Sequence, residues 1–185
     1  MPAHEYVTYC SNEALTLEDE NAALYTITAV SNSEATLSRA LTVAPATTPL
    51  LVENNSDESR TILLIPTDNQ ADDVTPATEF IGVLDAETTL AKNDNFDYYA
   101  FNGLDFVYVV DEVKIPVGKC FIGIQTGNLS ARTITIRRSA TAIDATLMNN
   151  EEMNNEQWFD LNGRKVNKPT KKGIYIKNGQ KVVIK

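Results

Sequence analysis

The sequence predicts an all-β fold: an antiparallel β-sandwich of jelly-roll type, followed by a short C-terminal unit of β-hairpins. Strand-sized segments rich in β-branched and aromatic residues recur along the chain, separated by Asn, Asp, Ser, Gly and Pro. Between Thr133 and Arg137 the residues alternate, so that Ile134 and Ile136 share one face and polar residues the other. The best helix candidate, residues 139–150, lacks a core stripe of adequate length. Many short strands with hairpin connections favour a sandwich.

The expected strands of the sandwich follow this pattern in chain order. They are residues 5–10, 23–30, 35–43, 49–52, 61–66, 79–84, 96–101, 104–110, 119–124 and 132–138. Asn102-Gly103 joins two aromatic-rich segments, and Asn-Gly is the dipeptide best suited to a type I′ turn because both central residues need a positive φ. Residues 96–110 are therefore predicted to form a β-hairpin.

Two more Asn-Gly dipeptides, Asn162-Gly163 and Asn178-Gly179, lie near the C-terminus and predict two hairpins with two-residue loops. The expected cross-strand pairs are Asp160 with Lys165, Phe159 with Val166, Tyr175 with Val182 and Ile174 with Val183. A unit of this size is marginal alone, so it needs to dock or to be recognised by a partner.

Charge divides the chain into two parts of opposite sign. Residues 158–185 carry eight Lys or Arg and one Asp, a net charge of +7, whereas residues 1–157 carry the other eight against 24 Asp or Glu, a net charge of −16. Residues 141–157 are polar, rich in Asn and Glu, and without strand pattern. The predicted organisation is an acidic β-sandwich module at 1–140, a linker at 141–157 and a basic hairpin tail at 158–185.

The composition excludes several classes of partner. The acidic body repels phosphate backbones, so no nucleic acid is expected to bind it. The chain lacks the run of about 18 apolar residues that a transmembrane helix needs, so it is not expected to span a membrane. Its first residues have neither the basic nor the apolar region of a signal peptide, so the chain is expected to be cytoplasmic or to lack its true N-terminus.

The cysteines Cys10 and Cys120 lie in strand-like segments far apart in the sequence, without the CxxC spacing of zinc or redox sites. Period-2 alternation puts Cys120 on the same face as Ile122 and Ile124, where a thiol behaves as a small hydrophobe. Two buried free thiols are favoured, and a disulfide between them is the alternative that an exported protein would allow.

Catalytic chemistry is not expected. The only histidine, His4, lies at the N-terminus, which argues against histidine-based triads and metal sites. Glycine loops for phosphate, nucleophile elbows and zinc-protease helices are missing from the sequence. Carboxylate pairs that could serve a glycosidase are Asp72-Asp73, Asp94 with Asp97, and Asp111-Glu112, but adjacent acids in polar loops are usually only solvated. No catalytic residue, cofactor or metal is therefore assigned.

Weaker signals point to other ligands. Asp94-Asn95-Phe96-Asp97, and Asp68 with Asp72 and Asp73, offer oxygen ligands for Ca²⁺ without an ordered ligand repeat. Asn54-Asn55-Ser56 and Asn128-Leu129-Ser130 fit the N-glycosylation pattern, which is frequent by chance. A sugar-stacking platform could be drawn from Tyr98, Tyr99, Phe101, Phe106, Tyr108 and Trp158. Alternation buries about half of these aromatics, so a core role is favoured.

The tail resembles a known class of C-terminal segment. Its residues Trp158-Phe159-Asp160-Leu161-Asn162-Gly163-Arg164 and Gly173-Ile174-Tyr175-Ile176-Lys177, followed by a basic end, are similar to the sorting domains read by the type IX (Por) secretion system of Bacteroidetes. These domains have an aromatic-Asp-Leu-x-Gly-Arg opening and a Gly-x-Tyr strand. By this resemblance the sorting residues are Asp160, Leu161, Gly163, Arg164, Gly173, Tyr175 and Lys185.

Four short upstream segments look like a β-rich module that often precedes this tail in secreted and surface proteins. They are residues 25–30, 44–51, 80–84 and 115–122. The resemblance implies an exported, cell-surface protein and supplies no catalytic residue. Such proteins begin with a signal peptide and usually a larger N-terminal module, so this sequence is expected to be a fragment or a truncated gene product.

The expected function is that of a non-catalytic accessory or interaction module of a secreted or cell-surface protein, whose tail meets the secretion machinery for export or anchoring. The sandwich would meet a protein or glycan ligand. A carbohydrate-binding module is the first alternative, and a carboxylate-dependent glycoside hydrolase is less favoured. The tail could also pack on the sandwich as extra strands without any signal role.

Overall fold

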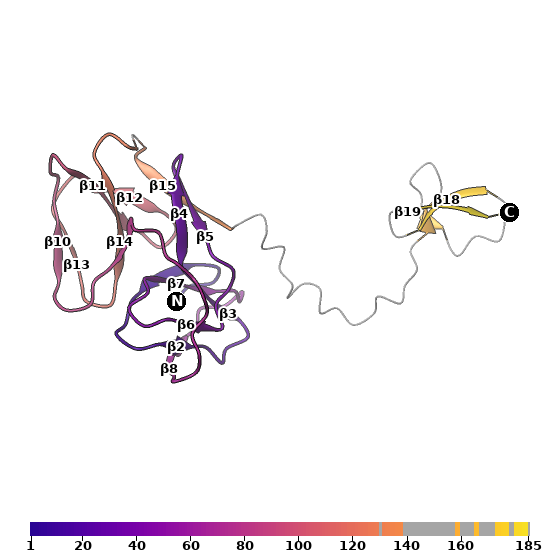
Figure 1. Cartoon of the computed structure of the whole chain (residues 1–185), viewed down its shortest axis with the longest axis horizontal. Helices are drawn as coiled ribbons and strands as arrows, with labels where there is room; N and C mark the ends of the chain where they lie inside the picture. Colours follow the sequence, from indigo (N-terminus) through magenta and orange to yellow (C-terminus); the bar gives the residue numbers. More distant parts are fainter. Residues whose placement is uncertain (130, 139–157, 160–164, 167–172, 178–179, 185) are drawn as a thin grey trace. The chain divides into compact units, whose positions relative to one another are not determined.

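The computed structural model describes residues 1–129, 131–138, 158–159, 165–166, 173–177 and 180–184, the last four ranges by their backbone (Figure 1). The chain divides into two compact units, Met1–Ala142 and Ile143–Lys185, called here the N-terminal domain and the C-terminal unit. All regular structure in the described ranges is β, which confirms the all-β prediction.

Strands of the N-terminal domain fall largely on the predicted segments. They are β1 (Tyr6–Tyr9), β2 (Leu15–Thr16), β3 (Ala22–Tyr25), β4 (Ile27–Ser31), β5 (Glu34–Leu37), β6 (Val43–Ala44), β7 (Leu50–Asn54), β8 (Ile65–Pro66), β9 (Phe80–Gly82), β10 (Thr88–Leu90), β11 (Phe96–Phe101), β12 (Phe106–Tyr108), β13 (Val113–Ile115), β14 (Cys120–Gln125) and β15 (Thr133–Arg138). The unpredicted strands β2, β10 and β13 are only two or three residues long, too short to display an alternating pattern.

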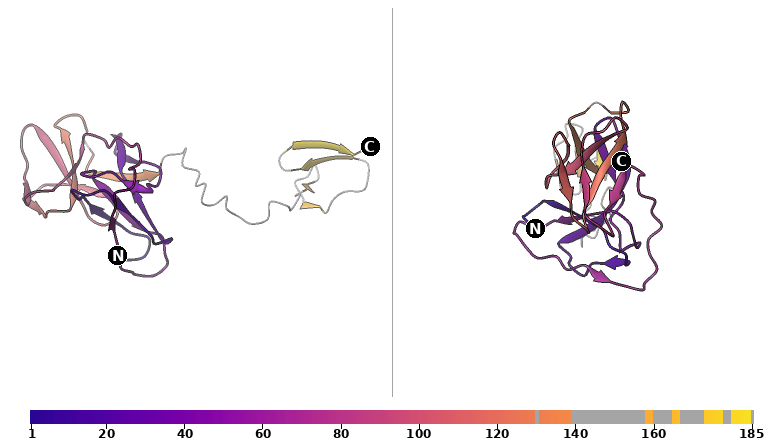
Figure 2. Two further views of the ribbon diagram at one scale, coloured as in Figure 1. Left: turned by 60° about the horizontal axis from the view of Figure 1, so that its bottom comes forward. Right: turned by 90° about the vertical axis from the view of Figure 1, so that its left-hand side faces the viewer.

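The largest sheet of the domain has seven strands in the order β4-β5-β15-β12-β11-β14-β9. Two sheets of three strands, β1-β7-β3 and β6-β2-β8, and the pair β10-β13 complete the N-terminal domain. The right-hand view of Figure 2 shows the pink to orange strands of the large sheet on one side of this domain and the indigo strands on the other. The sandwich-like arrangement therefore carries small additional sheets.

The main apolar cluster lies between the seven-stranded sheet and the β1-β7-β3 sheet. Leu51 and Tyr25 come from the smaller sheet, and the fully buried Tyr99, Phe106 and Ile122 come from the larger one. Each fully buried side chain of this size contributes about 1.5–3 kcal/mol to folding. The packing of these two sheets is therefore the principal source of stability.

Strand β7 is buried on both faces, which makes it the centre of the layered structure. While Leu51 faces the main cluster, its neighbours Leu50 and Val52 face a second cluster shared with Leu15 and Ala44 of the β6-β2-β8 sheet. A central strand reads as a continuous apolar run rather than an alternating one. The segment Leu50-Leu51-Val52 has this composition.

The predicted strand 23–30 is split at Thr26 into two strands that belong to different sheets, β3 and β4. Thr26 is fully buried, and its backbone and side chain are both satisfied outside the ladders. Its N–H donates to Ser38 Oγ at 3.1 Å, and its hydroxyl donates to the Pro49 carbonyl at 2.8 Å. These bonds let the chain change sheets without leaving buried polar groups unpaired.

The predicted hairpin of residues 96–110 is present, but its turn is not the expected one. Tyr99 pairs with Tyr108 and Phe101 with Phe106, which leaves four residues in the loop. The side chain of Asn102 accepts the backbone N–H groups of Leu104 and Asp105, at 3.0 and 2.9 Å. This longer loop brings Phe106 into the core, and that burial outweighs the preference of Asn-Gly for a tight turn.

A two-residue turn occurs instead between β4 and β5, at Asn32 and Ser33. Ser31 pairs with Glu34, and the two turn residues have φ values of 49° and 68°. Positive φ at both positions is the type I′ pattern predicted for Asn102-Gly103. Here the turn has no glycine, so the dipeptide signal was missing from the sequence.

One strand pair departs from the predicted antiparallel arrangement. β15 and β5 run parallel, with Thr135 opposite Glu34 and Arg138 opposite Leu37. The two strands are separated by most of the domain's sequence, so no hairpin constrains their relative direction. The other strand pairs of the described residues are antiparallel.

The C-terminal unit has its own sheet in the order β17-β16-β18-β19. Its strands are β16 (Trp158–Phe159), β17 (Lys165–Val166), β18 (Gly173–Lys177) and β19 (Gln180–Ile184). The pairing of β18 with β19 confirms the predicted Tyr175–Val182 and Ile174–Val183 contacts.

The predicted register of the first tail hairpin is wrong by one residue. Val166 lies opposite Trp158 rather than the expected Phe159, and Lys165 lies opposite Phe159, whereas Asp160 is outside the described residues. β16 also pairs with β18, where Trp158 meets Lys177. The register of β16 is therefore set by its pairing with both β17 and β18. The predicted linker, residues 141–157, and the helix candidate, residues 139–150, lie outside the described residues.

Candidate functional site

One described cavity with several ionisable side chains lies where the β11–β12 hairpin meets the segment leading into β15. It has a volume of about 320 Å³ and is lined by Lys92, Asp97, Tyr99, Tyr108, Val110, Leu129, Ala131 and Arg132. Asp97 and Tyr99 are two residues apart on β11, so alternation brings both side chains to the same face.

Tyr99, Tyr108 and Arg132 form the ordered side of this cavity. The rings of Tyr99 and Tyr108 meet edge to face with centroids 5.6 Å apart, and the guanidinium of Arg132 lies 5.1 Å from the centre of the Tyr108 ring. The Tyr99 hydroxyl donates to the Ala131 carbonyl at 2.9 Å. The Tyr108 N–H donates to the Arg132 carbonyl at 2.9 Å. These contacts hold the aromatic wall and the arginine in place.

The ionisable groups of the cavity are available to a ligand. Within the described residues Lys92, Asp97 and Arg132 make no ion pair. Burial raises the pKa of Tyr99, with further upward contributions from Asp97 and Tyr108. Tyr99 therefore stays neutral, with its hydroxyl proton donated to Ala131, while Lys92 and Arg132 offer donors to a ligand and Asp97 offers an acceptor.

This arrangement lacks the carboxylate pair of a glycosidase within the described residues. A glycosidase needs two carboxyl groups about 5–9.5 Å apart across the scissile bond. Asp97 is the only carboxylate that lines the cavity among the described residues. A polyhydroxylated ligand, by contrast, needs mixed donors and acceptors beside an aromatic ring.

The other predicted acidic residues do not line this cavity. Asp72 accepts the backbone N–H groups of Thr42 and Val43 at 2.6 and 3.4 Å, so it fixes a loop. Asp94, Asp111 and Glu112 are exposed. Among the described residues, no group of three or more His, Cys, Asp or Glu side chains is placed to hold a metal ion.

The candidate aromatic platform is largely taken up by packing. Tyr99 and Phe106 are fully buried, and Phe101 packs on Phe106 with ring centroids 4.9 Å apart. Tyr98 lies on the opposite face of β11 and stacks on the exposed Phe96, with centroids at 6.1 Å. The core role is therefore correct for Tyr99 and Phe106. The side chain of Trp158 lies outside the described part of the chain.

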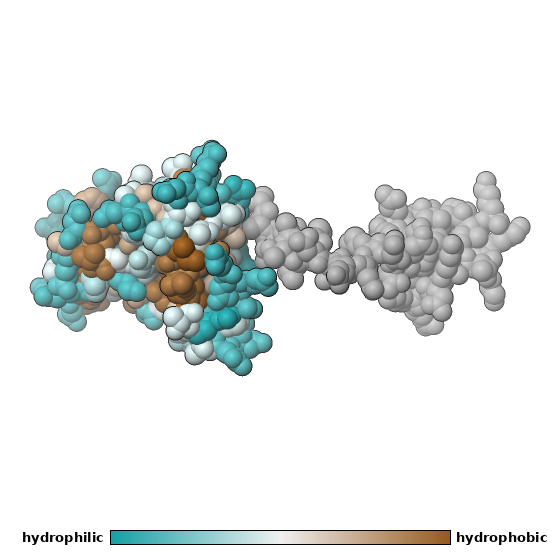
Figure 3. All heavy atoms as spheres, turned by 90° about the horizontal axis from the view of Figure 1, so that it is seen from below, coloured by the Kyte–Doolittle hydropathy of each residue, from teal (hydrophilic) through white to brown (hydrophobic). Residues whose placement is uncertain are grey.

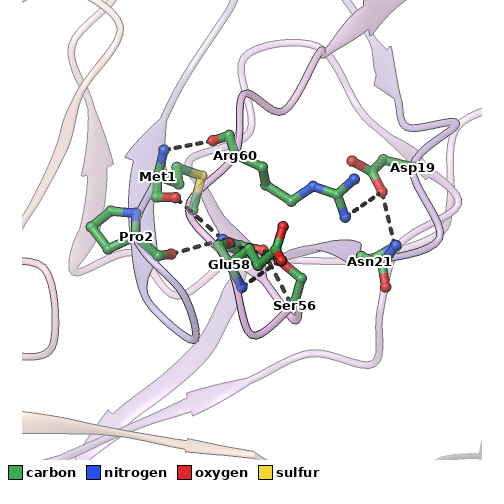
Figure 4. Close-up of polar contacts among 8 residues, drawn as sticks. Met1, Pro2, Asp19, Asn21, Ser56, Glu58 and Arg60 are labelled. Atoms are coloured by element: carbon green, nitrogen blue, oxygen red, sulfur yellow. Dashed lines mark hydrogen bonds and ion pairs between the residues drawn. The ribbon is translucent and has the colours of Figure 1, made fainter.

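The glycosylation pattern at Asn54 has a structural explanation. Asn54 is fully buried, and its amide nitrogen donates to the carbonyls of Met1, Pro2 and Glu58 at 3.2, 2.8 and 2.9 Å. Its side-chain oxygen accepts the N–H and the hydroxyl of Ser56. Figure 4 shows Met1, Pro2, Ser56 and Glu58 converging on this point. The amide is therefore committed to the fold and closed to a glycan.

An ion pair between the buried Glu53 and the partly exposed Arg138 ties β15 to the β1-β7-β3 sheet, and sequence reasoning missed it. Arg138 Nη2 lies 2.6 Å from both carboxylate oxygens of Glu53, whose side chain is 8% exposed. The same guanidinium lies over the ring of Tyr25 at 5.6 Å. Burial, then Glu53, raises the pKa of Tyr6 to about 12, and burial also raises the pKa of Tyr25. The partners lie far apart in sequence, so no local pattern signals them.

An apolar cavity of about 320 Å³ is lined by Met1, Val7, Tyr9, Val52, Ile62 and Leu64. Figure 3 shows hydrophobic side chains gathered into a patch on the underside of the N-terminal domain. The nearby chain also exposes Leu63, whose relative accessibility is 70%. Among the described residues, no Asp, Glu, Lys or Arg side chain lines this cavity.

The residues assigned to sorting by resemblance lie in the C-terminal unit. Gly173 and Tyr175 are in β18, opposite Ile184 and Val182 of β19. Asp160, Leu161, Gly163, Arg164 and Lys185 lie outside the described residues.

The described residues include no helix long and apolar enough to cross a membrane. Comparison of the chain with protein-family models, with curated proteins and with solved structures finds no match.

Proposed function

We propose that this chain is a non-catalytic accessory or interaction module of an exported, cell-surface protein, and that residues 158–185 direct its export or anchoring. The observation that carries the proposal is the tail itself. Its charge is opposite to that of the rest of the chain, and its strands pair within a separate compact unit. The proposed role in export or anchoring comes from the resemblance of its motifs to type IX sorting domains.

The separate sheet of the C-terminal unit supports recognition by a partner. Strand β16 is held by both β17 and β18, so the tail presents a small paired surface with its own register. Eight Lys or Arg in residues 158–185 give that surface a strong positive charge. Secretion machinery with a complementary acidic surface would find it by charge and read its backbone register.

Deletion of residues 158–185 tests the sorting role. The chain would be expressed behind a cleavable signal peptide in a Bacteroidetes host with a working type IX system. The full chain should reach the cell surface or medium, and the deletion variant should accumulate in the periplasm. Arg164→Ala should reproduce the deletion, whereas Lys168→Ala, also a tail cation, should not. Unaltered surface delivery of the deletion variant would contradict the proposal.

Glycan binding by the N-terminal domain is the second candidate, and the polar cavity favours it. The Tyr108 ring lines this cavity beside the guanidinium of Arg132, and Asp97, which makes no ion pair within the described residues, lines the same cavity. Sugars are bound by such combinations of ring faces and hydrogen-bonding groups. The single carboxylate in the cavity supports binding without hydrolysis.

A glycan array followed by calorimetry on the retained sugars tests this second function. Asp97→Asn and Lys92→Gln should each weaken binding at least about tenfold, the effect of about 1.4 kcal/mol. Lys114→Gln is the matched control, because Lys114 lies outside the cavity and pairs with Glu87 at 3.3 Å. An array without binding at high protein concentration, or equal losses in all three variants, would count against glycan binding.

A further inference from the structure

The cysteines of this chain lie at the junction between the two main sheets. Cys10 follows the end of β1, and Cys120 is the first residue of β14 in the seven-stranded sheet. Both are free thiols and both are buried, with relative accessibilities of 3% and 2%. These are the only cysteines in the sequence, so no other thiol competes for either of them.

Backbone contacts hold the two positions side by side. The Cys10 N–H donates to the Gly118 carbonyl at 3.0 Å, and the Cys120 N–H donates to the Thr8 hydroxyl at 3.3 Å. The Cys120 thiol itself lies 3.2 Å from the carbonyl oxygen of Tyr9, the residue before Cys10. Hydrogen bonds therefore hold residues 8–10 beside residues 118–120, the two segments that carry the thiols.

Gly82 explains how the two sulfur atoms come together. It lies directly opposite Cys120 in the β9–β14 ladder, and a Cβ placed on it would be 2.3 Å from the Cys10 sulfur. The Cβ atoms of directly opposite residues lie about 4.5–5.5 Å apart. The Cys10 sulfur thus fills the space of the missing Gly82 side chain, next to that of Cys120.

The thiols also affect each other's ionisation. A hydrogen bond from the Cys120 thiol lowers the pKa of Cys10, whereas burial raises the pKa of Cys120 well above its usual value.

We propose that Cys10 and Cys120 are a disulfide site, at which one bond staples the end of β1 to the start of β14 when the chain folds in an oxidising environment. The oxidant is a low-molecular-weight or protein disulfide such as glutathione disulfide. The Cys10 thiolate attacks one of its sulfur atoms and releases one glutathione thiolate. The Cys120 thiolate then attacks the Cys10 sulfur of the mixed disulfide and releases the second.

The electrons and protons of this exchange balance. Two protein thiols lose two electrons to the oxidant's sulfur–sulfur bond, and their two protons end on the two released glutathione thiols. The new bond closes a long loop and adds a covalent link between two sheets that the folded chain joins by packing, hydrogen bonds and the Arg138–Glu53 ion pair. We expect a rise in melting temperature of about 10 °C. Because disulfide formation needs only an oxidant, it can be tested independently of whether the tail directs export.

Refolding in a glutathione redox buffer tests the proposal on the full chain. The protein is unfolded in urea with reductant, refolded with glutathione disulfide, acid-quenched and weighed intact. The expected product lacks the mass of two hydrogen atoms, carries no glutathione, and yields one peptide linking Cys10 to Cys120. Its melting temperature should exceed that of the reduced protein.

Two results would overturn the proposal. One is a product that keeps both free thiols after refolding with oxidant, and the other is a product that carries one glutathione on each cysteine. The control is Cys120→Ala, in which the oxidant should neither remove two hydrogen atoms nor raise the melting temperature. A rise of equal size in that variant would show that the oxidant acts elsewhere.

Discussion

At the residue scale, Asn54 satisfies more backbone groups than any pattern in the sequence suggests. Its amide nitrogen donates hydrogen bonds to three backbone carbonyls from two segments of the chain. Its side-chain oxygen accepts the backbone N–H of Ser56 and so fixes the turn there. Such a residue is conspicuous only once the chain is folded, since its partners Met1 and Pro2 lie far from it in sequence. In the sequence the same residue looks like part of a glycosylation signal.

Replacing Asn54 by Leu should destabilise the N-terminal domain by about 3–5 kcal/mol, because several carbonyls lose their donor in a buried place. Asn54→Asp should be at least as damaging at neutral pH, since it sets a carboxylate against carbonyl oxygens. Urea unfolding measures both variants. Asn55→Ala at the exposed neighbour should change stability by less than about 0.5 kcal/mol. Equal effects at the two positions would contradict the role given to Asn54.

Gly82 is a second position where one atom decides the packing. An added Cβ would lie 2.3 Å from the Cys10 sulfur and 2.9 Å from its Cβ. Gly82→Ala should therefore cost about 1–3 kcal/mol of stability in the reduced protein through overpacking. In Cys10→Ala the obstructing sulfur is gone, so the same glycine substitution should cost less there. Additive effects in this double-mutant cycle would show that the two residues do not compete for space.

At the element scale, the ion pair between Arg138 and Glu53 ties β15 to the β1-β7-β3 sheet. Arg138→Met should destabilise the protein by about 3–5 kcal/mol, because it leaves the buried Glu53 carboxylate without its cation. Glu53→Met in the same chain should recover much of that loss, since two apolar side chains need no charge partner. Chemical unfolding of the single and double variants measures this. A double variant no better than Arg138→Met would contradict it.

The same cluster predicts loss of stability at alkaline pH. The pKa of Tyr6 is raised to about 12 in the folded state, from an ordinary value of 10.0. Stability from this residue is therefore full below pH 10 and is lost as pH rises toward 12, because the unfolded chain releases the proton first. Tyr6→Phe should reduce the slope of stability against pH in this interval. Identical slopes in the two proteins would show that Tyr6 is not responsible.

How far the elements could be predicted depends on what sets each one. Alternation placed β15 correctly, with Ile134 fully buried, because a half-buried strand carries its own pattern. Turns were less predictable: core burial of Phe106 lengthened the loop at Asn102. The polar cavity could not be anticipated, because Asp97 and Arg132 come from elements that meet only in the folded sheet.

At the scale of the whole molecule, the chain consists of an acidic N-terminal domain and a basic C-terminal unit. The four sheets of the domain enclose its apolar clusters, and the described residues include a polar cavity lined by Lys92, Asp97 and Arg132. The C-terminal unit keeps the hairpin register that its second Asn-Gly dipeptide predicts. This contrast of charge and structure is the physical basis for assigning ligand binding to one part and addressing to the other.

Transfer of residues 143–185 to an unrelated periplasmic reporter tests this division of roles most directly. In a host with a working type IX system, the fusion should leave the periplasm and appear on the cell surface or in the medium. The same fusion with Gly163→Ala and Arg164→Ala should stay in the periplasm, as should the reporter in a host without the system. If the intact fusion also stays in the periplasm, the tail is not an addressing segment.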